Sequence, residues 1–299
     1  MRITRYAALA AAAGIVLAGC SSEAGNEAQD AAENTAAVET DVSFDAGTTM
    51  ARLNEAGKIT VGTKIDQPGF GLLNPQTNEP EGFDVEIAEI IAAKLGIDAD
   101  KIEWVETPSK VREEVIEQGK VDFVVATYTI NDKRKQRISF AGPYYIAGQD
   151  IMVKKDDTSI TGPDSFKDGA KKVCSVTGST PAEKIKTYLK DAASQLVLFD
   201  VYSKCADALK NGQVDAVTTD NVILLGLVDK SGGEFNLVGK PFTEEPYGIG
   251  LKKDDTAFKD FINKTLEEAD KDGSYKKAWE DTAGKVAEET PELPAIDKS

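Results

Sequence analysis

The stretch Val124 to Tyr145, VVATYTINDKRKQRISFAGPYY, decides the fold and the candidate site. It begins as a β-branched run, which is typical of a strand. Thr127 and Thr129 are spaced so that both side chains point the same way at the end of that strand. Asn131 then has the position of an N-cap, so the pattern predicts a short helix directly after the strand.

Asp132 follows the predicted cap in the first turn, and three cations come directly after it, Lys133, Arg134 and Lys135. The helix dipole disfavours positive charge at this end, and a sequence selected only for stability would place acidic residues here. Two threonine hydroxyls, a helix N-terminus and a guanidinium group can together bind a carboxylate. A solvent-exposed basic turn after an ordinary strand is the alternative interpretation.

Residues 1–19 have the pattern of an export signal. Arg2 and Arg5 precede an apolar run, Tyr6 to Leu17, that is too short to span a bilayer. The tetrapeptide that ends in Cys20, LAGC, resembles the lipobox of bacterial lipoproteins. That resemblance implies lipidation of Cys20 as the first residue of the mature chain. A signal peptide that happens to contain a cysteine is the alternative.

Residues 20–47 are rich in Ala, Glu, Asp, Asn and Thr, with almost no large apolar side chain. Because such a segment cannot bury enough apolar surface to become ordered, we expect a flexible acidic tether. No later stretch approaches the roughly 18 apolar residues of a transmembrane helix. The sequence therefore predicts an exported protein that is held on the outer face of the cell membrane by its lipid anchor alone.

Composition excludes several classes of function. The formal net charge is −16, which argues against nucleic acid as a partner. The chain contains no histidine, so histidine-based triads and HExxH zinc sites are excluded. We expect no metal and no cofactor. An acidic protein that binds an anion needs a local cationic pocket, so clustered cations are informative here.

The chain contains three cysteines, and the lipobox accounts for Cys20. Cys174 and Cys205 remain as an even pair in an exported protein, which favours a disulfide between them. Two buried free thiols are the alternative.

Strand and helix patterns alternate along the rest of the chain, which predicts an α/β fold with mainly parallel sheets. In GFDVEIAEIIAAKLG, Gly82 to Gly96, apolar residues recur at helical spacing, and Asp84 is in a position to cap that helix. After a crossing near Tyr145 the alternation begins again, so we expect two lobes joined by two hinge connections. The expected boundaries are a first lobe at 48–146, a second lobe at 147–238, a return to the first lobe at 239–288, and a mobile tail at 289–299.

Four segments resemble, in the same order, the motifs of the family 3 extracellular solute-binding proteins, the amino-acid receptors of ABC importers. They are GFDVEIAEIIAAKL at 82–95, TYTINDKR followed by ISFAGPYY at 127–145, GST at 178–180 and NGQVDAVTTDN at 211–221. The resemblance implies a two-lobe fold of the periplasmic-binding-protein type (type II). It also implies a monomer that delivers an amino acid to membrane permease subunits without transforming it.

The resemblance also implies roles for individual residues. Arg134 has the position of the arginine that binds the ligand α-carboxylate, assisted by Thr129 and by the backbone near Thr127. Thr180, expected as the cap of a helix in the second lobe, matches a further carboxylate ligand. Asp220 matches the acid that binds the α-ammonium group. Read alone, Asp220 could equally be an ordinary turn acid.

Two aromatic residues are candidates for the ring that family members often place under the ligand, and they are Phe70 and Tyr202. The chain departs from Gram-negative glutamate receptors at Tyr202, where they have a histidine. A phenol can donate a hydrogen bond but carries no charge, so the departure affects the pocket for the ligand side chain.

The class of ligand depends on Lys64, Ser109 and Arg112. Family members for lysine-like ligands tend to carry an acid at the position of Lys64, whereas glutamate and aspartate receptors carry a cation there. Ser109 and Arg112 fit the Ser-x-x-Arg pair of those receptors. The charges of Lys64, Arg112, Arg134 and Asp220 sum to a surplus of positive charge, which favours an acidic ligand.

Several alternatives remain from the sequence. The chain could bind glutamine or another polar amino acid, with the two cations solvated. It could be an enzyme on the same fold, such as a dehydratase, although the sequence shows no acid–base candidate beyond Asp220. It could be a sensory domain, although no transmembrane or signalling segment follows.

Overall fold

The computed structural model describes residues 37–287 and 289–297, and these form two lobes, each built on a five-stranded sheet. The first sheet, in spatial order, consists of β5 (Ile102–Glu106), β1 (Ile59–Thr63), β6 (Phe123–Val124), β13 (Glu245–Leu251) and β7 (Ser139–Ala147). The second consists of β10 (Leu196–Phe199), β9 (Val173–Val176), β11 (Ala216–Asp220), β8 (Gln149–Lys154) and β12 (Phe235–Leu237). A small sheet joins β2 (Asp66–Gln67), β3 (Gly71–Leu73) and β4 (Pro80–Glu81).

Both sheets are mainly parallel but mixed, because four strands of each run in one direction and one strand runs antiparallel to them. β1 pairs in parallel with β5 and β6, and β9 pairs in parallel with β10 and β11. β13 and β8 run antiparallel to their neighbours. The antiparallel strands belong to the connections that cross between the lobes, so these connections are integrated into the sheets they join.

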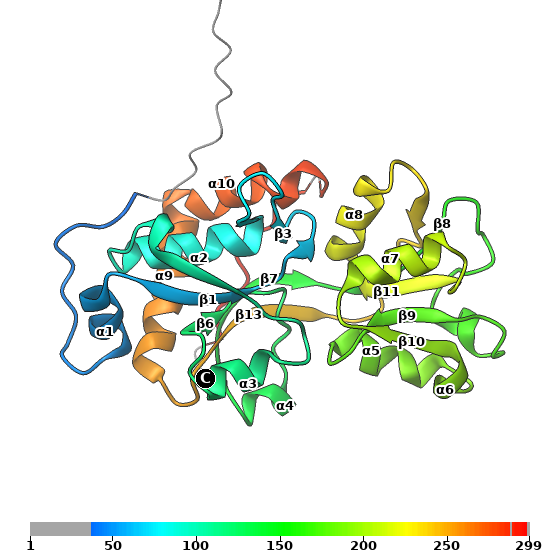
Figure 1. Cartoon of the computed structure of the whole chain (residues 1–299), viewed down its shortest axis with the longest axis horizontal. Coiled ribbons are helices and arrows are strands. Elements are labelled where there is room, and N and C mark those ends of the chain that lie inside the picture. Colours follow the sequence, from blue (N-terminus) through cyan, green and yellow to red (C-terminus); the bar gives the residue numbers. More distant parts are fainter. Residues whose placement is uncertain (1–36, 288, 298–299) are drawn as a thin grey trace, which may run out of the picture. The chain divides into compact units, whose positions relative to one another are not determined.

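Helices cover both faces of each sheet (Figure 1). The first lobe contains α1 (Thr49–Ala56), α2 (Phe83–Lys94), α3 (Arg112–Glu117), α4 (Asp132–Lys135), α9 (Thr256–Asp272) and α10 (Ser274–Asp281). The second contains α5 (Thr180–Ile185), α6 (Ala192–Gln195), α7 (Tyr202–Lys210) and α8 (Asn221–Lys230). Short 3₁₀ turns lie at η1 (Ala99–Lys101), η2 (Pro163–Phe166), η3 (Lys186–Tyr188) and η4 (Ala283–Lys285). In Figure 1, α7 and α8 lie on one face of the second sheet, and α5 and α6 lie on the other.

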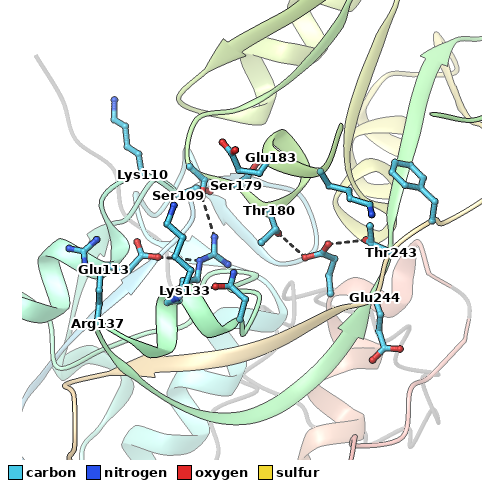
Figure 2. A pocket seen from close by; sticks show the side chains of 16 residues that line it. Ser109, Lys110, Glu113, Lys133, Arg137, Ser179, Thr180, Glu183, Thr243 and Glu244 are labelled. Atoms are coloured by element: carbon cyan, nitrogen blue, oxygen red, sulfur yellow. Dashed lines mark hydrogen bonds and ion pairs between the residues drawn. The ribbon is translucent and has the colours of Figure 1, made fainter. Parts of the chain in front are cut away.

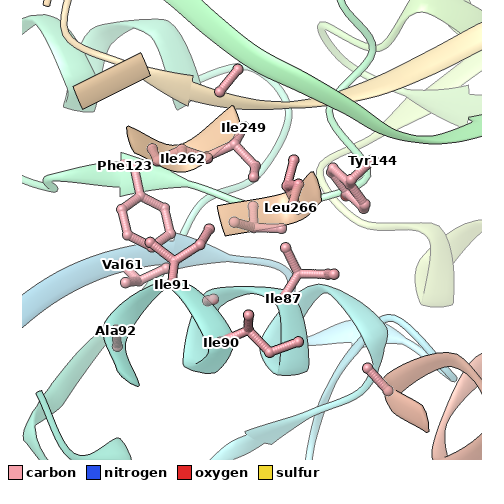
Figure 3. Close-up of a cluster of buried hydrophobic side chains, with 14 of the residues drawn as sticks. Val61, Ile87, Ile90, Ile91, Ala92, Phe123, Tyr144, Ile249, Ile262 and Leu266 are labelled. Atoms are coloured by element: carbon pink, nitrogen blue, oxygen red, sulfur yellow. The ribbon is translucent and has the colours of Figure 1, made fainter. Parts of the chain in front are cut away.

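The core of the first lobe confirms the helical spacing predicted for residues 83–95. Ile87 and Ile91 of α2 are fully buried and pack beside Ile262 and Leu266 of α9, with Phe123 of β6 in the same apolar cluster (Figure 3). Full burial of such side chains contributes about 1.5–3 kcal/mol each, so this layer fixes α2 on the sheet.

The predicted capping role of Asp84 is wrong. Gly82 is the N-cap of α2, at φ +128°, and a Cβ there would lie 2.4 Å from the Phe70 carbonyl oxygen. Because the chain enters the helix so close to Phe70, only glycine fits at the cap. The Asp84 carboxylate instead points inward, where it accepts hydrogen bonds from the Thr127 N–H and the Tyr144 hydroxyl.

Parts of two terminal segments contact the first lobe. At the end of the expected tether, the Glu39 N–H donates to the Ala93 carbonyl, and Phe44 contacts the Phe261 ring edge to face. In the expected mobile tail, Asp297 lies 2.8 Å from the Lys135 ammonium group. Single apolar side chains in both segments pack on the first lobe. The overall composition of the segments does not reveal these positions.

No helix within the described ranges is long and apolar enough to cross a membrane. The predicted export signal, Cys20 and the first part of the tether lie outside the described residues.

Candidate functional site

The turn after β6 is held in an unusual conformation. The predicted strand ends early, at Val124, and Thr127 adopts a left-handed φ of +45°, which costs free energy for a β-branched residue. The Thr127 N–H donates to the buried Asp84 carboxylate at 2.8 Å. The Thr127 hydroxyl donates to the Ala126 carbonyl at 2.7 Å. Asp84 therefore compensates for the strain and fixes this turn at the edge of the cleft.

Arg134 is positioned by the predicted cap. The Asn131 side chain accepts from the Arg134 N–H at 2.9 Å and starts α4. The guanidinium donates from Nη1 to the Thr129 carbonyl at 2.6 Å and from Nε to Glu113 at 3.1 Å. From Nη2 it donates to the Gly178 carbonyl of the second lobe at 3.2 Å. Arg134 thus joins the two lobes. All three of its guanidinium nitrogens already donate to oxygen acceptors.

Two further cations are buried close to the turn. Arg112 donates to the Ala126 carbonyl at 2.7 Å, and its guanidinium lies 4.0 Å above the Tyr128 ring. Lys64 donates to the Ser109 hydroxyl at 3.0 Å. Burial, reinforced by the charge of Arg112, lowers the pKa of Lys64 to about 7. Lys64 therefore gains or loses its charge near neutral pH.

An acid lies on the other side of the cleft, at the end of β11. Asp220 accepts from the Tyr247 hydroxyl at 2.7 Å through Oδ2. Its Oδ1 is buried and has no hydrogen-bond partner among the residues that the structure describes. Burial and the neighbouring charge of Glu245 raise the pKa of Asp220 to about 7. The free oxygen can accept a hydrogen bond from a cationic donor.

The threonines of the two lobes meet across the cleft. The Thr129 and Thr180 hydroxyls are 3.2 Å apart, and Thr180 donates to Glu245 at 2.7 Å. Ser179, not Thr180 as predicted, is the N-cap of α5 and accepts from the Ala182 N–H at 3.0 Å. Because Ser179 caps the helix, the Thr180 side chain is free to cross the cleft.

These groups surround a small cavity between the lobes, of about 10 Å³, enough for about one water molecule. Its lining consists of Ser109, Arg112, Thr127, Thr129, Ser179, Thr180, Pro181, Tyr202, Asp220 and Ile223. Arg134 lies beside it and lines a wider cleft of about 860 Å³, in which Ser109 and Glu113 of the first lobe face Ser179 and Thr180 of the second (Figure 2). An amino acid fits the inner site only after the lobes separate.

Three predicted site residues do not line the cavity: Arg134 lies beside it, Lys64 lies behind Ser109, and Phe70 lies in the first-lobe core. The Phe70 ring is 1% exposed and lies 6.0–6.2 Å from the rings of Phe83, Tyr247 and Trp279. Phe70 is part of the first-lobe core, so its position does not support the interpretation as a ring under the ligand. Tyr202 does line the cavity and is also buried.

Three acids near the site were missed by sequence analysis, and they are Asp84, Glu113 and Glu245. Asp84 and Glu245 are buried, and Glu113 is paired with Arg134. With these acids included, the predicted surplus of positive charge is lost. Only the position of Asp84 inside an apolar helical face was visible in the sequence, whereas Glu113 and Glu245 look like ordinary surface acids.

Cys174 and Cys205 form a disulfide, which confirms the predicted pairing. It joins β9 to α7, the helix that begins with Tyr202. The bond therefore ties one wall of the cavity to the second sheet.

Known proteins share this architecture. The family model described as bacterial extracellular solute-binding proteins, family 3, matches residues 59–282. The glutamate-binding protein GluB of Corynebacterium efficiens is 44% identical over 79% of this chain and 84% of its own length. The ABC transporter glutamine-binding protein GlnH of Bacillus subtilis is 40% identical over 76% of this chain and 81% of its own. A solved ancestral arginine-binding protein bound to glutamine superposes with a TM-score of 0.69, at 37% identity, over 76% of this chain and 97% of that one.

Proposed function

Because the chain belongs to the bacterial extracellular solute-binding proteins, family 3, we propose that it captures an acidic amino acid, L-glutamate or L-aspartate, between its lobes. The lobes close on the ligand and open again at the permease of an ABC importer, which takes the amino acid up. The ligand leaves unchanged, as expected for a receptor rather than an enzyme.

The observation that carries this proposal is the separation of charge along the inner cavity. Arg112, with Lys64 behind Ser109, lies on the first-lobe side. Asp220, with its free Oδ1, lies on the second-lobe side. An amino acid with a second carboxylate matches this arrangement. Its ammonium group would meet the anionic Asp220, and its side-chain carboxylate would meet the cationic Arg112.

Each ligand group has an assigned partner. Arg134, Thr129 and Thr180 bind the α-carboxylate, with the guanidinium exchanging its bond to the Gly178 carbonyl for one to the ligand. Asp220 binds the α-ammonium group through Oδ1. The side-chain carboxylate of the ligand binds a third group of residues.

That group consists of Arg112, Ser109 and Lys64. Arg112 has one bond to a carbonyl and a buried Nε without a partner among the described residues, so it retains a donor for the ligand. Lys64 reaches the cavity through Ser109. The glutamate-binding names of the relatives at 44% and 43% identity agree with this assignment.

Glutamine is the second candidate, and one feature of the site favours it. Lys64 loses much of its charge near pH 7, and Glu113 and Glu245 offset the remaining cations. A neutral amide could then be accepted, as the glutamine-binding names of relatives at 40% and 38% identity suggest.

We further propose that the mature chain begins at Cys20 and that a lipid on this residue anchors it on the outer face of the cell membrane. The segment from 20 to the first lobe is the tether, and one monomer serves one ligand. The proposed lobes keep the boundaries expected from the sequence, 48–146 with 239–288 for the first and 147–238 for the second.

Calorimetric titration of the mature chain tests the proposal. L-glutamate or L-aspartate should bind at least tenfold more tightly than L-glutamine, which corresponds to about 1.4 kcal/mol. L-arginine should not bind. Equal or tighter binding of glutamine or arginine would overturn the acidic assignment, and turnover of any bound ligand would overturn the receptor role.

A further inference from the structure

The helix that begins with Tyr202 has no cap from its own lobe. α7 runs for nine residues, and its N-cap is Val201, whose side chain cannot accept a hydrogen bond. The first amide groups of a helix have no acceptor within the helix. An acceptor must therefore come from elsewhere.

Asp66 of β2, in the small sheet of the first lobe, supplies that acceptor. Its Oδ2 accepts from the Tyr202 N–H at 2.7 Å and lies 3.4 Å from the Ser203 N–H. A carboxylate is the favoured group at this end of a helix because the helix dipole is positive there. The cap and the helix belong to different lobes, so the bond exists only while the lobes are together.

The surroundings show how closely the two lobes fit at this point. A Cβ on Gly226 of α8 would lie 2.4 Å from the Pro68 carbonyl oxygen, two residues after Asp66. Oδ1 of Asp66 is buried and has no partner within the described ranges. The carboxylate is thus held by the helix end rather than by neighbours in its own lobe.

We propose that Asp66 is a positioning residue for ligand capture: it caps α7 across the cleft, which favours the closed form and holds Tyr202 in the cavity wall. This inference rests on the proposed function only in taking closure as the step that retains the ligand. Asp66 contacts backbone rather than ligand, so its contribution is the same for every ligand that the closed form holds.

When closure is linked to binding, a residue that stabilises the closed form changes the apparent dissociation constant of all ligands by one common factor. A residue of the side-chain pocket changes the affinity of acidic ligands alone. The ratio of glutamate to glutamine affinity separates the two roles.

The experiment compares Asp66→Ala and Asp66→Asn with the unmodified chain, by titration with L-glutamate and with L-glutamine. Asp66→Ala should weaken both ligands by about fivefold to tenfold, as for a lost helix cap, without changing their ratio. Asp66→Asn, which keeps an acceptor oxygen, should lose less. Asp191→Asn is the matched control, because Asp191 caps α6 within the second lobe and should leave both affinities unchanged.

Hydrogen exchange without any ligand supplies a second measurement. The amides of Tyr202 and Ser203 should exchange faster in Asp66→Ala than in the unmodified chain, while the Ala193 amide should not change. This arm reports on the cap even if neither amino acid binds, in which case the proposed function, not the cap, has failed. Unchanged affinities together with unchanged exchange at Tyr202, or a loss confined to glutamate, would overturn the positioning role.

Discussion

The Thr129 hydroxyl lies 3.2 Å from the Thr180 hydroxyl, and the two residues belong to different lobes. The Thr180 hydroxyl donates a hydrogen bond to the Glu245 carboxylate, so a continuous chain of polar groups crosses the cleft beside Arg134. A ligand carboxylate at Arg134 would enter this chain and bridge the lobes directly. Closure and recognition therefore use the same side chains.

Replacing Arg134 by Ala should weaken every amino-acid ligand by about 3 kcal/mol or more, because it removes the α-carboxylate partner and leaves the half-buried Glu113 without its cation. Titration with glutamate, aspartate and glutamine measures the effect. Arg52→Ala is the control, since Arg52 forms an exposed ion pair with Asp122 and should not alter affinity. Tight binding of any of these ligands by Arg134→Ala would contradict the assignment.

Glutamate affinity should pass through a maximum near pH 7. Burial and Glu245 raise the pKa of Asp220 to about 7, so below this pH the carboxyl is protonated and binds the ammonium group less well. Burial and Arg112 lower the pKa of Lys64 to about 7, so above this pH the side-chain carboxylate loses a cation. On either side of the maximum, glutamate affinity should fall by up to roughly tenfold per pH unit.

Two variants test which residue causes the loss of affinity on each side of that pH profile. Lys64→Met should bind glutamate more weakly and lose the alkaline limb, while Asp220→Asn should lose the acid limb. The measurement is a titration series from pH 5.5 to 8.5, a range set by the two pKa values. Profiles of the same shape in all three proteins would show that these groups do not control binding.

Loss of the disulfide should destabilise the second lobe and loosen the site together. Cys174 and Cys205 are 31 residues apart, and closing such a loop stabilises a fold by roughly 3–4 kcal/mol. The double variant Cys174→Ser/Cys205→Ser should therefore melt roughly 6–16 °C lower. Glutamate affinity should also fall, because the bond ties α7 to β9.

Mass spectrometry of a non-reduced digest provides the control for this prediction, since it detects the linked peptides in the native exported protein. If both cysteines can be alkylated without reduction, the bond does not form in the cell. An unchanged melting temperature in the double variant would show that the disulfide does not stabilise the fold.

Periodic apolar patterns accounted for much of the fold. The helix α2 lies within the stretch Gly82 to Gly96, where apolar residues recur at helical spacing. The cap at Asn131 was equally visible because a cap depends on neighbours in sequence. These features are local, so the sequence carries them directly.

The remaining features depend on contacts between distant residues. Thr127 adopts its left-handed φ because Asp84, 43 positions earlier, accepts its N–H. Phe70 was assigned to the ligand, but four aromatic side chains from other elements enclose it in the core. Glu245 reaches Thr180 only because the return strand passes the cleft. No local pattern contains this information.

Recognition of the side-chain carboxylate of an acidic ligand is the role proposed for Arg112. The most direct measurement is a thermodynamic cycle in which Arg112→Gln and the unmodified chain are each titrated with L-glutamate and L-glutamine. The two ligands differ only in the side-chain group, so the cycle isolates its coupling to Arg112. Arg112→Gln should lose about 2 kcal/mol or more of binding free energy for glutamate and much less for glutamine. Equal losses for both ligands would contradict it.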